Sequence, residues 1–323
     1  MPTRTVIAGT GGYLPVRSLS NDELAAEHGL ETSDAWIVER TGIRQRHIAA
    51  PGETASDMGA AACRAALEQA GRGAEAVDAV IVATATPDST FPSTAARIQG
   101  KLGVTRGLAF DVTAACAGFI YAIGVADSLI RTGQARGVLV VGTEVFSRIL
   151  DWTDRGTCVL FGDGAGAVLL LAEEGPTDRG ILSTHMHADG RHGDILQVDG
   201  GPGSTGGTGV VRMAGREVFR HAVQKLASAV DEALAANGLD KSEVRWLVPH
   251  QANLRIIDAM GKKLGLPPER VVVTVDRHAN TSAASIPLAL AEATRDGRIA
   301  RGDLVLMEAI GGGLTWGASL ARF

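Results

Sequence analysis

Three residue types that act together in nucleophilic catalysis occur at Cys116, His250 and Asn280. A cysteine thiolate can accept an acyl group, a histidine can transfer protons, and His and Asn can both donate hydrogen bonds to a developing negative oxygen. Each residue lies in a turn after a predicted apolar strand, which is where sites form in α/β folds. Cys116 also fits a simpler interpretation, because free cysteines are often just small buried core residues.

The segment 107–131 predicts how Cys116 is presented. It indicates a short strand, a turn of small residues at Cys116, and then a helix that is apolar on nearly all sides. A helix of this kind is buried in a protein rather than exposed on one face. We expect the free N–H groups and the positive dipole at the helix start to favour the thiolate form of Cys116.

An internal repeat relates Cys116 to Asn280. The strand that begins at Val77 recurs after 167 residues, a Lys-Leu-Gly sequence recurs after 162, and the helix that ends at Arg131 recurs after 164. Landmarks that keep their order and spacing indicate a duplicated unit. The offset of 164 pairs Cys116 with Asn280, so we expect their turns to meet near a pseudo-twofold axis.

The order of the predicted elements indicates the fold class α/β. We expect two halves, residues 1–177 with the cysteine and residues 178–323 with His250 and Asn280, built from mostly parallel sheets covered by helices. The strands that the sequence predicts in these halves include residues 5–9, 77–83, 138–141, 244–248, 271–275 and 304–307.

Composition excludes several classes of protein. Apolar residues make up 45% of the chain and charged residues 21%, as in an ordinary globular protein. The net charge of −5 and the absence of a basic block argue against a nucleic-acid partner. The three cysteines have neither metal-site nor disulfide spacing, and no apolar run has membrane-spanning length. We therefore expect a cytoplasmic protein with no metal site and no membrane association.

Two glycine-rich segments and the residues around Cys116 exclude three common kinds of site. The glycines at 9–12 are followed by polar residues and Pro15, so they do not form a dinucleotide fingerprint, and those at 162–166 lack the Lys and the helix of a phosphate-binding loop. A cysteine protease would also combine Cys, His and Asn, but the residues around Cys116 lack a papain-like signature. Acyl transfer onto carbon is the other use of this trio.

Six motifs, spread over most of the chain, make the sequence similar to the 3-oxoacyl-[acyl-carrier-protein] synthase III family. They are DVTAACAG at 111–118, DRGT at 154–157, FGDGAG at 161–166, PHQAN at 249–253, RHANTS at 277–282 and GGGLTWG at 311–317. The resemblance implies a thiolase-like, duplicated α/β/α/β/α fold with two pseudo-twofold-related halves. It also implies the initiating condensing enzyme of fatty-acid synthesis, a homodimer that needs no cofactor.

The resemblance implies a role for each member of the trio. Acyl-CoA would acylate Cys116, and His250 and Asn280 would stabilise the enolate formed when malonyl-carrier protein loses CO₂. The carbanion would then attack the Cys116 thioester to give a 3-oxoacyl-carrier protein. The N–H groups of Cys116 and Gly312 would form the oxyanion hole.

The resemblance also implies three sets of binding residues. Residues implied for CoA and its pantetheine arm are Thr32, Trp36, Arg40, Arg155, Gly156, Met213, Gly215, Phe219, Ala252 and Asn253. Residues implied for the acyl carrier protein are Arg220, Gln251, Arg255, Lys262 and Lys263. Residues implied for the acyl pocket are Phe91, Ile310 and Leu314, of which Ile310 and Leu314 stand where the family pattern has Phe.

Two other functions remain open at this point. The chain could be a related thiolase-fold acyltransferase of secondary metabolism, which would transfer an acyl group without decarboxylating malonyl-carrier protein. It could also be a catalytically idle module that binds a carrier protein. The acyl primer, whether acetyl, longer straight-chain or branched, is not specified by the sequence.

Overall fold

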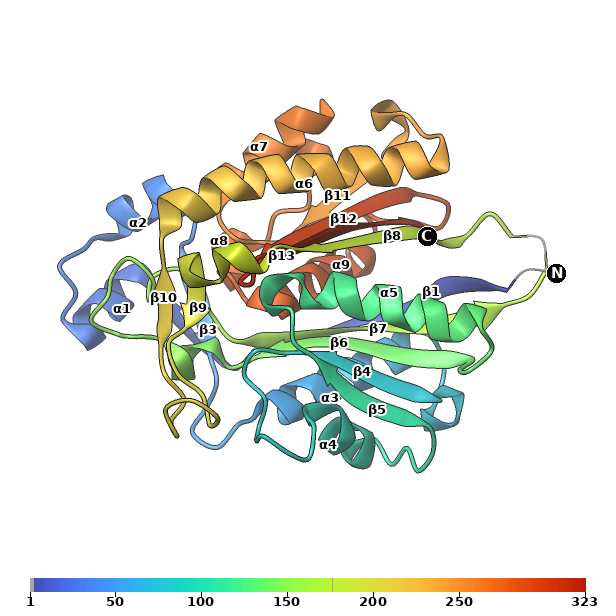
Figure 1. The fold of residues 1–323 in the computed structure, drawn as a ribbon, viewed down its shortest axis with the longest axis horizontal. Coiled ribbons are helices and arrows are strands. Elements are labelled where there is room, and N and C mark those ends of the chain that lie inside the picture. Colours follow the sequence, from blue (N-terminus) through green and yellow to red (C-terminus); the bar gives the residue numbers. More distant parts are fainter. Residues whose placement is uncertain (1–2, 176) are drawn as a thin grey trace.

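The computed structural model describes residues 3–175 and 177–323, and it arranges them in five alternating layers of helices and sheets (Figure 1). The first sheet contains, in spatial order, β1 (Arg4–Tyr13), β7 (Gly164–Glu173), β6 (Gly137–Glu144), β4 (Ala79–Ala83) and β5 (Leu108–Val112). The second sheet contains β11 (Trp246–Pro249), β12 (Leu304–Gly311), β13 (Thr315–Arg322) and β8 (Gly180–Ala188).

Helices cover both outer faces and fill the space between the sheets. The outer helices are α3 (Ala55–Gln69) and α4 (Thr94–Lys101) on the first sheet, and α6 (Gly215–Asn237) and α7 (Leu254–Leu264) on the second. The central layer consists of α5 (Gly118–Arg131) and α9 (Ser285–Arg295), whose side chains form one core cluster with residues of both sheets. This is the α/β/α/β/α arrangement that we predicted.

The two sheets show the predicted duplication. The order β8-β13-β12-β11 in the second sheet repeats β1-β7-β6-β4 in the first, and a parallel bridge between Leu247 and Val271 occupies the place of β5. The pairs β4 and β11, β6 and β12, and α5 and α9 each begin 167 residues apart. The boundary that we propose at residues 177–178 lies in the connection from β7 to β8.

Our expectation of mostly parallel sheets was wrong. The pairs β4–β5, β4–β6 and β11–β12 are parallel, whereas β1–β7, β6–β7, β12–β13 and β13–β8 are antiparallel. The apolar runs show only that a strand is buried on both faces, and a five-layer fold buries antiparallel strands in the same way.

The central position of α5 follows from its sequence. Eight of its residues are buried, and the charged side chains are confined to its second half at Asp127 and Arg131. A Cβ atom at Gly118 would lie 2.9 Å from the Ala83 Cβ, so glycine allows the helix start to approach β4 closely. The prediction of a buried helix after Cys116 is confirmed.

The remaining elements gather at one end of the layers, at the left of Figure 1. They are β2 (Arg17–Ser20), α1 (Asn21–His28), α2 (Asp34–Thr41), β3 (Gln45–Ile48), β9 (Leu196–Val198), β10 (Val211–Met213) and α8 (Val275–His278). The predicted strand at 271–275 is reduced to the single bridge at Val271, because the chain turns into α8 at Val275. In the described part of the chain, no helix is long and apolar enough to cross a membrane.

Candidate active site

A cavity of about 810 Å³ brings the predicted trio together between the two halves. Cys116, His250 and Asn280 all line it, and so does Gly312 from the turn after β12. The convergence that the repeat predicted is therefore present. The walls come from the segments before the two central helices, from the ends of β11 and β12, and from α2, α6, α7 and the β9–β10 pair, so both halves contribute.

Cys116 lies in the 3-10 turn Ala115–Ala117 directly before α5 and is only 5% exposed. Burial raises the pKa of the Cys116 thiol to about 12; the Ser282 hydroxyl opposes this rise and the nearby Glu144 carboxylate adds to it. Our expectation of a resting thiolate was wrong, because the loss of solvent outweighs the stabilisation from the helix start. Cys116 must give its proton to a base when it reacts.

The structure also corrects the pairing of Cys116 with Asn280. Ala115 and Ser282, which are 167 residues apart, have φ angles of 45° and 49° and each lies in a 3-10 turn before a central helix. The true counterpart of Cys116 is therefore Ala283, and Asn280 lies three residues earlier. The offset of 164 came from the helix ends, because α9 has 11 residues and α5 has 14.

His250 follows β11 directly and is 4% exposed. Its main-chain N–H donates to the Glu308 carbonyl oxygen on β12 at 2.8 Å. Burial lowers the pKa of the imidazole to about 3, so the ring is neutral near pH 7. A neutral imidazole has one nitrogen that accepts a proton and one that donates, so it can act either as a base or as a hydrogen-bond donor.

The amide of Asn280 is oriented by its own turn. Its Oδ1 accepts a hydrogen bond from the Ser282 N–H at 2.9 Å, and its main chain is bonded to Leu160 and Gly162 at 2.9 and 3.0 Å. With the oxygen engaged, the NH₂ group is the part of the amide that is left to serve the cavity. Asn280 is therefore set up as a hydrogen-bond donor.

The last residue of β12 packs closely against the Cys116 main chain. A Cβ atom at Gly311 would lie 2.5 Å from the Cys116 nitrogen, so only glycine permits this approach. The Thr315 hydroxyl donates to the Ala114 carbonyl oxygen at 2.8 Å and ties the same two segments together. Gly312 is thereby held at the cavity wall beside Cys116.

Most of the residues predicted to bind CoA line this cavity. Trp36 lies near its mouth, with the Arg40 and Arg155 guanidinium carbons 4.4 and 5.0 Å from its ring centroid. Thr32 and Arg155 are not among the lining residues, although Arg155 contacts Trp36 and donates to the Glu31 carbonyl. The predicted residues that do line the cavity are Trp36, Arg40, Gly156, Met213, Gly215, Phe219, Ala252 and Asn253.

Comparison with known proteins gives a consistent result. Family models described as 3-oxoacyl-[acyl-carrier-protein (ACP)] synthase III and its C-terminal part match residues 110–190 and 234–323. A beta-ketoacyl-[acyl-carrier-protein] synthase III from Acidiphilium cryptum is 68% identical over 99% of both chains. A protein of the same name from Rhodospirillum centenum is 64% identical over 100% of both. The chain belongs to the 3-oxoacyl-[acyl-carrier-protein] synthase III family.

The fold agrees with this assignment. The crystal structure of 3-oxoacyl-[acyl-carrier-protein] synthase III from Aquifex aeolicus superimposes with a TM-score of 0.93 and 47% identity, covering 99% of this chain and 100% of that one. The family resemblance, the thiolase-like fold class and the acyltransferase class of condensing enzyme are thereby confirmed. The trio is therefore placed in the cavity of a fatty-acid condensing enzyme.

The residues predicted to meet the carrier protein of this family divide into two groups. Arg220, Arg255 and Lys262 are exposed, and Arg255 also lines the cavity. Lys263 is exposed too and pairs with Asp231 at 3.4 Å. The prediction for Gln251 was wrong, because this side chain is fully buried and its amide is bonded inside the protein.

Of the three residues predicted for the acyl pocket, only one lines the cavity. Ile310 lines the cavity, but Leu314 is fully buried in the core beside α6 and does not reach it. Phe91 is 83% exposed and does not line the cavity. Sequence reasoning missed Phe146 and Phe161, which stack at 4.4 Å in the cavity wall. Their apolar positions resembled ordinary core, and only the FGDGAG motif around Phe161 gave a signal.

Proposed function

We propose that Cys116, His250 and Asn280 carry the condensing reaction of this enzyme in two half-reactions. In the first, His250 takes the Cys116 proton, the sulfur attacks the acyl-CoA thioester, and CoA leaves as the thiol with that proton. The neutral imidazole of His250 has a ring nitrogen available to accept the proton. Because the pKa of Cys116 is raised and that of His250 is lowered, the proton moves only as the sulfur attacks the thioester. The observation that carries the proposal is the single cavity in which the nucleophile, the imidazole and the Asn280 amide meet.

In the second half-reaction, malonyl-carrier protein replaces CoA. The bond from its α-carbon to the carboxylate breaks, CO₂ leaves, and the electron pair becomes an enolate whose oxygen receives hydrogen bonds from His250 and Asn280. The α-carbon then attacks the Cys116 thioester, and the sulfur leaves as a thiolate that takes up one proton from water, which restores the Cys116 thiol. The N–H groups of Cys116 and Gly312 stabilise the tetrahedral oxyanion. Acyl-CoA and malonyl-carrier protein are substrates, and no step needs a cofactor.

Substrate binding follows from the shape and charge of the mouth. Trp36 with Arg40 and Arg155 offers a flat face and two cations to the adenine nucleotide of acyl-CoA, and Thr32 and Gly156 lie close by in sequence. The pantetheine arm extends along the cavity towards Cys116. An acidic carrier protein meets the cations of α6 and α7, which are Arg220, Arg255, Lys262 and Lys263.

Assembly and location belong to the same proposal. Phe91 is a large apolar side chain that is 83% exposed, which supports a homodimer in which this segment contacts the partner subunit. Cys63, Cys116 and Cys158 are all free, which supports the reducing environment of the cytoplasm. A Phe91→Asp variant that sediments like the wild type at every protein concentration would contradict the contact at Phe91.

A two-stage assay tests the function and separates the alternatives. Incubation with a panel of acyl-CoAs, followed by intact-mass measurement, is expected to show one acyl group that depends on Cys116. Addition of malonyl-carrier protein is then expected to release CO₂ and form 3-oxoacyl-carrier protein. Acylation without CO₂ release would indicate the plain acyltransferase, and no acylation by any member of the panel would indicate the idle module. The preferred panel member identifies the primer.

A further inference from the structure

Gln251, the residue after His250, occupies an unusual position for an amide. The side chain is fully buried, and both ends of it are bonded to main-chain groups. Its Nε2 donates to the carbonyl oxygens of Pro249 at 2.9 Å and Val272 at 3.0 Å. Its Oε1 accepts from the N–H groups of Thr274 and Val275 at 2.8 and 3.0 Å.

These four bonds join two segments that each carry a catalytic group. Pro249 is the last residue of β11 and precedes His250, while Thr274 and Val275 form the start of α8, which leads to Asn280. The oxygen of Gln251 thus accepts hydrogen bonds from N–H groups at the start of α8, and such groups have no acceptor within their own helix. One side chain therefore fixes the strand end of His250 to the helix that leads to Asn280.

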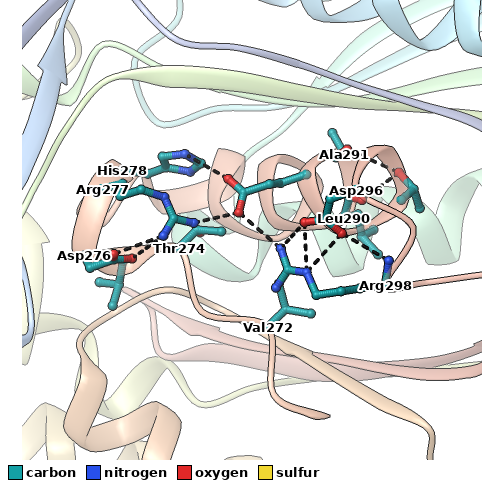
Figure 2. A network of polar contacts seen from close by, with 12 residues as sticks. Val272, Thr274, Asp276, Arg277, His278, Leu290, Ala291, Asp296 and Arg298 are labelled. Atoms are coloured by element: carbon teal, nitrogen blue, oxygen red, sulfur yellow. Dashed lines mark hydrogen bonds and ion pairs between the residues drawn. The ribbon is translucent and has the colours of Figure 1, made fainter. Parts of the chain in front are cut away.

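The other end of α8 is held separately. Figure 2 shows Arg277 and His278 of α8 and Arg298 converging on a carboxylate of α9, which belongs to Glu292. Arg277 donates to Glu292 at 2.6 Å and Arg298 does so at 3.2 Å. This network ties α8 to the central layer, but it does not touch the His250 strand end. The main chain already joins β11 to the segment before α8 through the Val272 N–H, which donates to the Leu247 carbonyl oxygen at 2.9 Å. Gln251 adds a side-chain link from the end of β11 to the start of α8 itself.

We propose that Gln251 is a positioning residue that sets the distance between His250 and Asn280 and so supports the condensation step. The inference rests on the proposed function of these two residues. Condensation requires both groups to donate to one enolate oxygen, so an error in their relative placement weakens both hydrogen bonds together. Acylation of Cys116 needs only a proton acceptor and is less sensitive to where Asn280 lies.

The test replaces the amide without changing the size of the side chain. We compare Gln251→Met with a control, Asn237→Leu, which removes an amide that donates to Ser183 and Ala233 at 2.7 and 2.8 Å at the far end of α6. Both half-reactions are measured with acetyl-CoA, or the best acyl-CoA of the panel, and with malonyl-carrier protein. In Gln251→Met, kcat for condensation is expected to fall roughly 10- to 100-fold, since misplacement by about 1 Å costs that much. The KM for malonyl-carrier protein and the rate of Cys116 acylation should change less than about threefold.

Each outcome decides the proposal. Equal loss of acylation and condensation, or a loss no larger than that of Asn237→Leu, would overturn it. If Gln251→Met does not fold, Gln251→Glu takes its place, because it retains the oxygen for Thr274 and Val275 but loses the donor to Pro249 and Val272. Failure of both variants to fold would assign Gln251 to folding alone and overturn the proposal. Failure of the wild type to condense would instead contradict the proposed function.

Discussion

The two turns that present Cys116 and Asn280 have closely similar backbones but are held in different ways. Ala115 and Ser282 occupy equivalent positions with φ of 45° and 49°, and each precedes a buried central helix. The Cys116 turn is fixed mainly by close main-chain packing against the last residue of β12. Ala283, just after Asn280, is packed in the same close way against Gly142 of β6. The segment that leads to Asn280 is in addition held by polar side chains, with Gln251 at the start of α8 and the Glu292 network at its end.

This difference matches what each turn has to do. A nucleophilic sulfur needs an exact place and a dry surrounding, which backbone packing provides without adding polar groups. A hydrogen-bond donor needs an orientation, which a set of fixed hydrogen bonds provides. Duplication supplied two equivalent turns, and the surroundings of each turn then determined its chemistry.

The largest effect is expected for the nucleophile itself. Cys116→Ser should lose more than about 1,000-fold in acylation, because a hydroxyl in this dry site is a far weaker nucleophile than a thiolate. Intact-mass measurement after incubation with acyl-CoA reports the acyl-enzyme directly. Cys158→Ala, which removes a buried cysteine outside the cavity, is the matched control and should acylate like the wild type.

The close packing of the halves predicts a large stability effect. A Cβ atom at Gly142 on β6 would overlap the Ala283 carbonyl oxygen beside the Asn280 turn, and main chain cannot move aside cheaply. Gly142→Ala should lower the free energy of unfolding by roughly 3 kcal/mol, as overpacking does. In Gly124→Ala the new Cβ atom would lie 2.9 Å from atoms of the flexible Met186 side chain, which can move aside, so the loss of unfolding free energy should be smaller. Urea titrations that rank the two variants the other way would contradict the packing account.

The mouth of the cavity predicts a moderate effect on binding. Trp36→Ala removes the ring that Arg40 and Arg155 contact and should raise the KM for acyl-CoA roughly 3- to 10-fold, with little change in kcat. Trp152→Ala serves as the control, because Trp152 stacks on His28 at 4.1 Å and does not line the cavity. A steady-state KM that rises equally in both variants would remove Trp36 from the binding site.

A smaller effect is expected from a buried carboxyl next to the His250 strand end. Glu308 has two carboxyl oxygens without a hydrogen-bond partner among the described residues, and burial raises its pKa from 4.5 to about 8. Between these values the folded protein keeps a proton that the unfolded chain has lost, so this group stabilises the fold at low pH and the effect is lost as pH rises through 8. Glu308→Gln cannot ionise, so its free energy of unfolding should fall less than that of the wild type between pH 5 and 9. Denaturation curves would contradict this if the difference in stability between the variant and the wild type were the same at pH 5 and at pH 9.

The sequence predicted the parts of the structure that depend on local patterns. The apolar helix after Cys116, the layered duplicated fold and the convergence of the trio were all expected from apolar patterns, repeats and motifs. Strand direction was not, because burial on both faces looks the same in parallel and antiparallel strands. The apolar residues 271–275 likewise predicted a strand, whereas Gln251 binds the main chain there and favours the start of α8.

The sequence was weakest for the environment of individual side chains. A helix start predicted a thiolate at Cys116, but the loss of solvent on folding raises its pKa, and this depends on residues far away in the chain. Gln251 belongs to the same motif as His250 and Asn253, which line the cavity, yet it points into the core. Motif membership indicates that a residue is near the site, and only the fold determines which way the residue faces.

The most direct test of the divided roles uses Asn280→Ala in the two half-reactions. We predict that this variant still acylates Cys116 at a rate within about threefold of the wild type. Once acylated and supplied with malonyl-carrier protein, it should release CO₂ about 100- to 1,000-fold more slowly, as expected when one donor to a developing oxyanion is lost. Equal loss of acylation and CO₂ release in Asn280→Ala, with the fold intact, would contradict the account.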